Sequence, residues 1–332
     1  MSIPKKDAVF DLALRPTEWA DYIGQESVKS NLKILIEAAK GRNEPIDHIL
    51  LYGPAGLGKT TLANLIAKKS GSQIRITSGP AIEKVGDLAS ILTGLAEGDI
   101  LFIDEVHRLN KLVEEILYPA MENSVLDIII GKGPSAKTIQ LQLPRFTIIA
   151  ATTKIGSISS PLRSRFGATY RLDFYTKEEI EKILERSAAL LDVLAEKEAL
   201  ELISKVSRST PRIANRILKR VRDYSQVNGS GMITKKLAKE ALELMEIDEI
   251  GLERADIKLL ETIIEKYSGG PVGLKTLAAS TFEEEETIED VHEPYLLQIG
   301  FLARTPQGRT ATKKAYEHLG INFSEKTLTT KS

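Results

Sequence analysis

The chain has 332 residues, of which 42% are hydrophobic and 27% are charged, and its formal net charge is −1. These values are ordinary for a globular protein, and the length predicts two or three domains rather than one core. The near-neutral charge excludes attraction of nucleic acid by bulk charge, so any such contact must come from a local basic patch. The absence of cysteine excludes disulfides and thiolate metal sites. With no apolar leader and no apolar stretch of about 18 residues, we expect a cytoplasmic protein.

Residues 45–175 alternate short apolar runs with helical patterns, which is typical of a parallel α/β sheet. The candidate strands are 47–52, 73–77, 99–104, 145–151 and 168–173. We therefore expect residues 1–175 to form one α/β domain, into which a hairpin at 125–143 is inserted.

A complete G-x-x-x-x-G-K-[ST] phosphate loop lies between the first strand and the next helix. Its residues are Gly53, Pro54, Ala55, Gly56, Leu57, Gly58, Lys59 and Thr60. Glycines let backbone N–H groups turn inward around an anion, which then sits at the N-terminus of the following helix. The Lys59 ammonium can reach the β- and γ-phosphates, and the Thr60 hydroxyl can bind Mg²⁺. The loop predicts a site for a nucleoside triphosphate.

Two acids follow the strand at 99–104, namely Asp104 at its end and Glu105 directly after it. Ligands of open α/β sheets bind at the carboxyl ends of strands, where the phosphate loop also lies. Asp104 would hold Mg²⁺ through water, and Glu105 would act as the general base toward the attacking water. The competing interpretation is that the two acids only cap the next helix.

Two more candidates follow the strand at 145–151. The hydroxyl of Thr152 or Thr153 could orient the attacking water, although threonine is also favoured in strands for its β propensity. The segment 160–167 contains Arg163 and Arg165. An arginine delivered to the γ-phosphate of a neighbouring subunit would stabilise the charge of the transition state, whereas a solvated basic loop is the alternative.

Beyond residue 175 the pattern becomes helical. A capping box of Thr176 and Glu179 predicts one helix start, and Thr210 followed by Pro211 predicts another. We expect residues 176–250 to form a small all-helical lid domain.

Residues 251–324 have the element order of a winged helix. Helices are predicted at 255–267, 272–280 and 287–299, followed by a hairpin with a turn at 306–308. We expect this segment to be a separate domain and residues 325–332 to be a flexible tail.

Charge is unevenly distributed in this last domain. The third helix and its approach are acidic, with Glu283, Glu284, Glu285, Glu286, Glu289, Asp290 and Glu293. The hairpin carries bases with no acid between them, namely Arg304, Arg309, Lys313 and Lys314. Phosphates would repel the helix, so we expect the wing to bind DNA without sequence specificity. A solvated basic face is the alternative.

Short motifs follow one another at 14–16, 22–25, 53–60, 102–109, 118–122, 130–136, 161–167, 210–216, 269–274 and 289–296. In this order they resemble the AAA+ ATPases and, more closely, the RuvB family of Holliday junction branch-migration motors. The resemblance covers residues 12–323, and the segments 131–136 and 269–323 are specific to this family. It implies an AAA+ P-loop domain of the α/β class, a helical lid and a C-terminal winged helix.

The resemblance also implies roles for single residues. The nucleotide site, for ATP or ADP with Mg²⁺, would include the phosphate loop together with Leu14, Arg15, Tyr22, Ile23, Thr61, Asp104, Tyr175, Pro211 and Arg212. Among these, Arg15, Tyr22 and Ile23 fall where the family holds the adenine ring. Thr153 would be the first sensor, Arg165 the arginine finger acting in trans, and Arg212 the second sensor. Glu105 and Lys59 complete the catalytic set.

The resemblance implies partners as well. The hairpin at 125–143 is similar to the one that docks on the junction-binding protein RuvA, with Ile128, Ile129 and Ile130 as its apolar contact. The alternative is an ordinary core hairpin. A hexameric homo-oligomer acting with RuvA and RuvC in DNA recombination, repair and the SOS response is expected.

The sequence departs from the family pattern at two positions. Ala55 stands where a second proline is more frequent, and Gln307 replaces a residue that is often basic. Two other functions remain open at this point. The chain could be a clamp-loader-like AAA+ switch that acts on a protein ring, or a non-enzymatic DNA-binding regulator.

Overall fold

The computed structural model describes residues 13–130, 137–229 and 231–323, with side chains described except at 128–130, 137 and 138. The chain divides into two compact units, Met1–Tyr175 and Thr176–Ser332. The predicted tail at 325–332 and the tip of the predicted hairpin at 131–136 lie outside the described residues. Among the described helices, none has the length and apolarity needed to cross a membrane.

The first unit is built on a five-stranded sheet with the order β2-β3-β6-β1-β7. All four strand pairs of this sheet are parallel. Its strands are β1 (Ile49–Tyr52), β2 (Ile74–Ser78), β3 (Ile100–Asp104), β6 (Thr147–Thr152) and β7 (Ala168–Arg171). The helical segments are η1 (Trp19–Asp21), α2 (Glu26–Arg42), α3 (Lys59–Ser70), η2 (Gly79–Ala81), α4 (Val85–Thr93), η3 (Val106–Arg108), α5 (Lys111–Asn123), η5 (Ile155–Ser157) and α6 (Ser160–Arg163).

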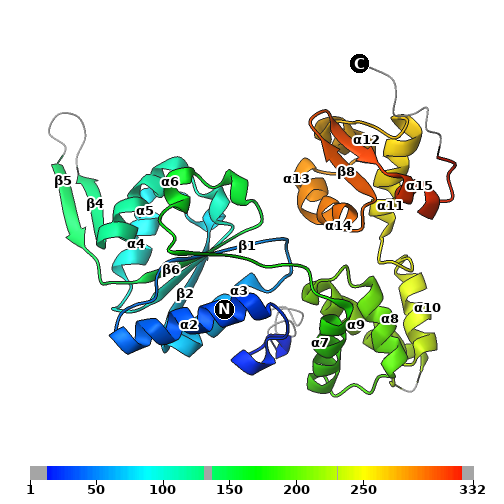
Figure 1. Cartoon of the computed structure of the whole chain (residues 1–332), viewed down its shortest axis with the longest axis horizontal. Coiled ribbons are helices and arrows are strands. Elements are labelled where there is room, and N and C mark those ends of the chain that lie inside the picture. Colours follow the sequence, from blue (N-terminus) through cyan, green and yellow to red (C-terminus); the bar gives the residue numbers. More distant parts are fainter. Residues whose placement is uncertain (1–12, 131–136, 230, 324–332) are drawn as a thin grey trace. The chain divides into compact units, whose positions relative to one another are not determined.

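The central strands are apolar because helices cover both faces of the sheet. Leu101 and Ile103 of β3 pack into a core with Leu88 of α4 and Leu117 of α5. Successive strand residues point to opposite faces, so Phe102, which is fully buried, belongs to the other face. Figure 1 shows α2 and α3 on that side of the sheet. This layering brings the carboxyl ends of β1, β3 and β6 to one edge.

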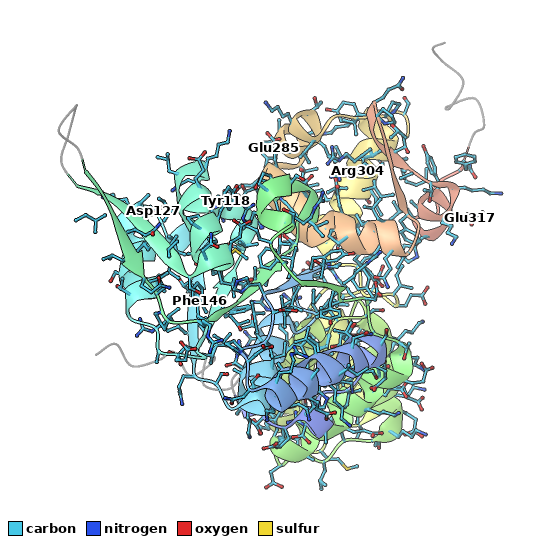
Figure 2. The ribbon with its side chains drawn as sticks, turned by 60° about the vertical axis from the view of Figure 1, so that its left-hand side comes forward. Tyr118, Asp127, Phe146, Glu285, Arg304 and Glu317 are labelled. Atoms are coloured by element: carbon cyan, nitrogen blue, oxygen red, sulfur yellow. The ribbon has the colours of Figure 1, made fainter. Side chains whose placement is uncertain are left out.

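An antiparallel hairpin leaves the sheet after α5. Its strands β4 (Val125–Ile130) and β5 (Lys137–Gln142) pair from Val125 with Gln142 to Ile130 with Lys137. The hairpin extends away from the five-stranded sheet (Figure 1). Asp127 marks β4 in Figure 2, where the Gln140 amide donates to it at 3.1 Å.

The second unit begins with four helices and continues with a set of helices and a hairpin. The first four are α7 (Lys177–Leu190), α8 (Lys197–Val206), α9 (Pro211–Asn228) and α10 (Lys235–Leu244). The later elements are α11 (Arg254–Glu261), η6 (Thr262–Lys266), α12 (Leu274–Thr281), α13 (Glu285–Thr287), η7 (Ile288–His292), α14 (Glu293–Gln298), β8 (Leu302–Thr305), β9 (Gly308–Ala311) and α15 (Lys313–His318).

The helix starts in this unit follow from capping. Thr176 accepts from the Glu179 N–H at 3.2 Å, and the Glu179 carboxylate accepts from the Thr176 N–H at 2.8 Å. This is the predicted capping box, so that prediction is confirmed. Pro211 occupies the first turn of α9, where its missing N–H costs nothing.

A buried ion pair joins the turn before α9 to α11. The Arg208 side chain, 4% exposed, donates to Asp256 at 2.6 Å and to the Gly251 carbonyl at 2.9 Å. Asp256 is fully buried and also bonds the His292 ring at 2.6 Å. Both charges are thus compensated inside the protein, as buried charges must be.

The last elements share a separate core with Leu259, Leu277, Leu296 and Tyr316. Their order of helix, helix, helix and hairpin is that of a winged helix. The predicted fold class, a parallel α/β sheet followed by an all-helical part and a winged helix, is confirmed.

Candidate active site

The phosphate loop connects β1 to α3 and depends on glycine. Gly53 has φ 142°, and a Cβ there would lie 2.4 Å from the Leu172 carbonyl oxygen. Gly58 has φ 91° and precedes α3, whose N-terminus has no side-chain cap. A Cβ at Gly58 would lie 3.0 Å from the Tyr22 hydroxyl. The loop is therefore tight, and the N–H groups at the start of α3 are left to an anion.

Lys59 lies in this loop with only 8% of its surface exposed. Its ammonium donates to the Gly53 carbonyl at 2.7 Å and to the Pro54 carbonyl at 2.8 Å. Burial lowers the pKa of Lys59 to about 8, although the nearby Asp104 charge acts in the opposite direction. A polyphosphate would supply the counter-charge that this buried cation lacks.

The Thr60 hydroxyl lies 3.4 Å from the Asp104 carboxylate, so the two predicted Mg²⁺ residues are brought together. The other Asp104 oxygen accepts from the Glu105 N–H at 2.9 Å. A hydroxyl and a carboxylate beside an anion site are the donor set that Mg²⁺ takes with phosphates. These residues fit a nucleoside triphosphate with its metal.

Glu105 directly follows β3 with a left-handed backbone, φ 48°. A Cβ on Gly79 would lie 2.4 Å from the Glu105 carbonyl oxygen, so the β2 loop closes over this backbone. The Glu105 carboxylate is half-exposed, and Arg108 lies 3.7 Å from it. Such a long, exposed ion pair is weak, so the Glu105 carboxylate stays accessible to solvent.

The two threonines at the end of β6 differ in their surroundings. Thr152 is 1% exposed, and its hydroxyl bonds the His107 ring at 3.0 Å and the Lys154 N–H at 2.9 Å. Thr153 is half-buried. The hydroxyl of Thr152 is thus engaged inside the protein, which leaves Thr153 as the candidate for contact with water or substrate.

The candidate base-binding residues come from both ends of the first unit. The Tyr22 and Tyr175 hydroxyls lie 3.4 Å apart, and both donate toward the Leu57 carbonyl, at 3.4 and 3.2 Å. Burial raises the pKa of Tyr22 well above its usual value. Leu14 is buried, Ile23 is half-buried and Arg15 is exposed.

Arg165 is packed against its own subunit. Its guanidinium lies 4.3 Å from the centre of the Tyr118 ring, contacts Glu122 at 3.0 Å and donates to the Pro161 carbonyl at 2.6 Å. Among the described buried side-chain atoms, its Nε alone has no hydrogen-bond partner. Arg163 is exposed by contrast. Figure 2 labels Tyr118 on α5, the helix that carries Glu122 as well.

Three family models together cover nearly the whole chain. The RuvB P-loop domain of the Holliday junction DNA helicase matches residues 14–172, the RuvB AAA lid domain matches 175–248, and the RuvB C-terminal winged helix domain matches 249–320. The chain belongs to the RuvB family. It is accordingly a P-loop AAA+ ATPase, and the resemblance found in the sequence is confirmed.

Solved structures agree with this membership. The RuvB Holliday junction branch migration motor of Thermotoga maritima is 51% identical over 94% of this chain and 100% of that chain, with a TM-score of 0.87. A single-substitution variant of the same RuvB gives 51% identity over 94% of this chain and 99% of that one, with a TM-score of 0.88.

In this RuvB-family chain the lid residues lie on α9. Arg212 is exposed on the first turn, directly after Pro211. Of the apolar residues that recur every three or four positions along α9, Ile217 and Val221 are buried, whereas Ile213 and Tyr224 are half-buried.

In the winged helix of this RuvB-family chain, two wing arginines are paired with acids. Arg304 donates to Glu289 at 2.7 Å and to Glu293 at 2.9 Å, and Arg309 bonds the same Glu293. The Glu293 side chain is 2% exposed. No acid lies between the wing bases in sequence, but β8 packs against α14 and brings carboxylates and arginines together in space.

The basic residues of the wing differ in how far they are exposed to solvent. About half of the Arg304 side chain stays exposed, whereas the Arg309 side chain is 11% exposed. Arg304 is labelled in Figure 2. Lys313 lies 3.8 Å from Glu317, with both side chains mostly exposed, and Lys314 is exposed. Arg304 and the two lysines are therefore available to a ligand, and Arg309 is mainly structural.

Proposed function

We propose that the chain is an ATP-dependent motor that drives branch migration of Holliday junctions, acting as a hexameric ring with RuvA. The observation that carries this proposal is similarity along the whole chain to the Thermotoga maritima branch migration motor. The geometry supports it, because the phosphate loop, Asp104, Glu105 and Thr153 gather at one edge of one sheet.

In this proposal each residue has one task. Lys59 and the start of α3 would bind the β- and γ-phosphates. Thr60, and Asp104 through water, would hold Mg²⁺, which would polarise the γ-phosphate. Glu105 takes the proton of the attacking water, and Thr153 orients that water. Arg165 reaches the γ-phosphate of the next subunit in trans. Arg212 is the second sensor, which reaches from the lid to the γ-phosphate. The residues Leu14, Arg15, Tyr22, Ile23, Thr61, Tyr175 and Pro211 enclose the rest of the nucleotide.

The proposed partners come from the resemblance to the RuvB family. The β4–β5 hairpin is the proposed docking element for RuvA, through Ile128, Ile129 and Ile130, and RuvC is expected in the same complex. Arg304, Lys313 and Lys314 are proposed to contact the phosphates of duplex arms. Phosphate contacts do not depend on base sequence, which suits a motor that moves along any DNA.

A branch-migration assay tests the function. The full chain with ATP is expected to convert a four-way junction into duplex products, faster with RuvA than without it. A Glu105→Gln chain is the matched control, since it keeps the shape of the site and lacks the base. Absence of migration with intact DNA-stimulated ATP hydrolysis would instead support a clamp-loader-like switch.

The carboxylates beside the wing lead to a second prediction, which concerns the affinity for DNA. Glu289→Gln removes one negative charge next to Arg304, so we expect tighter binding to duplex DNA and a salt dependence steeper by about one counterion. Fluorescence anisotropy from low to moderate salt measures both quantities. Glu284→Gln, an exposed substitution of equal charge, is the control. Equal effects of the two substitutions would show that only net charge matters and would contradict contact by Arg304.

A further inference from the structure

Thr152 is the point where three loops of the active site meet. Its carbonyl oxygen accepts from the N–H of Gly53, the first residue of the phosphate loop, at 3.2 Å. Its hydroxyl accepts from the Lys154 N–H at 2.9 Å, which fixes the backbone around Thr153. The same hydroxyl bonds the His107 ring at 3.0 Å. One buried residue therefore contacts all three: its backbone carbonyl holds the phosphate loop, and its hydroxyl links the Thr153 loop to the loop after Glu105.

The bond with His107 lies beyond the end of the sheet ladder. Strands β3 and β6 are paired only as far as Ile103 with Ala150, and the next β3 residue, Asp104, pairs with Ser78 on the other side. Past that point no ladder bond holds the β3 loop to the β6 loop. The His107–Thr152 bond supplies the missing connection, two residues after Glu105 and one residue before Thr153.

The loop that carries Glu105 is short, and other contacts hold its backbone as well. The Glu105 carbonyl accepts from the Arg108 N–H at 2.9 Å, which closes η3, and Gly79 packs against the same carbonyl. His107 is the side chain of η3 that points back to β6. Either ring tautomer maintains the bond, because the Thr152 hydroxyl can donate its proton to Nδ1 or accept one from it.

We propose that His107 and Thr152 are a positioning pair that keeps Glu105 in register with Thr153 and the phosphate loop during ATP hydrolysis. The proposal rests on the roles given to Glu105 and Thr153 under the proposed function. It assigns no contact with ATP to either member of the pair. The pair acts on the rate of the chemical step, since a shift of about 1 Å in a catalytic group can cost 100-fold in rate.

Substitutions that remove the bond test the pair. Thr152→Val and His107→Leu are each expected to lower kcat for ATP about 10- to 100-fold, with KM and the calorimetric Kd for MgADP within about twofold. The double variant should be no slower than the slower single variant, because both changes remove the same bond. Thr152→Ser and His107→Asn keep a polar atom at the same position and should restore most of the turnover.

Three outcomes would contradict the positioning role of His107 and Thr152. These are normal kcat in both single variants, multiplicative losses in the double variant, or loss of MgADP affinity equal to the loss of turnover. A slow Thr152→Val chain beside a normal His107→Leu chain would assign the effect to the bond between the Thr152 hydroxyl and the Lys154 N–H, and would exclude His107 from the positioning role. Thermal unfolding of each variant separates misfolding from misplacement, and the Ser and Asn variants carry the test if the others do not fold.

The Glu105→Gln chain, measured in parallel, separates this inference from the proposed function. If Glu105→Gln turns over ATP normally, the proposed general base is wrong whatever the pair does. If Glu105→Gln is inactive and the pair variants are normal, only the positioning role is wrong.

Discussion

Two variants that are inactive alone are expected to restore ATP hydrolysis when they are mixed. Arg165→Ala lacks the proposed finger, and Lys59→Ala lacks the phosphate-binding ammonium. In a mixed ring, an Arg165→Ala subunit keeps its own Lys59 and can receive Arg165 from a Lys59→Ala neighbour. Random mixing in equal amounts should therefore return about a quarter of the wild-type rate. Arg165→Ala alone should fall by about 10³-fold or more, and Lys59→Ala alone by at least about 100-fold.

If each ATP site were formed by one subunit alone, the mixture would not regain ATP hydrolysis. That result would contradict the trans role of Arg165. Arg163→Ala is the matched control, because Arg163 is an exposed arginine of the same loop and has no proposed contact with ATP. It should hydrolyse ATP at a normal rate. Thermal unfolding of Arg165→Ala measures what its contacts with Tyr118 and Glu122 contribute to stability.

Arg165 must first leave the contacts that hold it within its own subunit. The guanidinium is engaged by Glu122 and Tyr118 within its own subunit, so it must leave these groups to reach a neighbouring phosphate. A partly exposed ion pair of this kind is worth little, on the order of 1 kcal/mol or less. Release is therefore inexpensive compared with the stabilisation of transition-state charge.

The second large effect is expected at Lys59. Lys59→Ala should lower ATP turnover at least about 100-fold, the usual loss when one preorganised charge is removed from a developing anion. Normal hydrolysis by this variant would contradict the proposed function. Phosphate release in steady state measures the effect, and thermal unfolding checks that the buried position tolerates alanine.

The same lysine makes nucleotide binding depend on pH. In the free protein burial lowers the pKa of Lys59 to about 8, and a bound polyphosphate would raise it. Below pH 8 the ammonium is already charged, so binding is insensitive to pH through this group. Above pH 8 binding must take up a proton, and the Kd for MgADP should rise toward about tenfold per pH unit.

Calorimetry between pH 7 and 9.5 measures this slope. Lys59→Arg is the control, because a guanidinium stays charged over the whole range and should give a flat profile from this position. The same slope in both proteins would assign it to another group.

Local motifs made the catalytic edge predictable. The phosphate loop, Asp104 and Glu105 are read from contiguous residues that follow apolar strands, and parallel strands bring such residues to one edge. The strand limits were less accurate, since β7 ends at Arg171 and not at residue 173. Beyond Arg171 the apolar Leu172 still donates its N–H to the Tyr52 carbonyl at 2.8 Å, so neither composition nor this bond marks the end of the strand.

Contacts between distant residues were not predictable in the same way. The wing arginines had no acid near them in sequence, and their partners Glu289 and Glu293 lie on a helix whose packing against β8 is tertiary. His107 was also missed as a single residue. Its only local signal was a ring two residues after Glu105, and the contact with Thr152 spans 45 positions.

The buried pair of Arg208 and Asp256 limits how freely the winged helix can be exchanged between relatives. A chimaera that joined this lid to a winged helix without a carboxylate at the Asp256 position would leave the buried Arg208 guanidinium with only the partly exposed Glu253, 3.4 Å away, as an acidic partner. Loss of one partner from a buried pair costs about 3–5 kcal/mol, a large share of the stability of one domain. We therefore expect the sequences of the lid and the winged helix to change together in evolution.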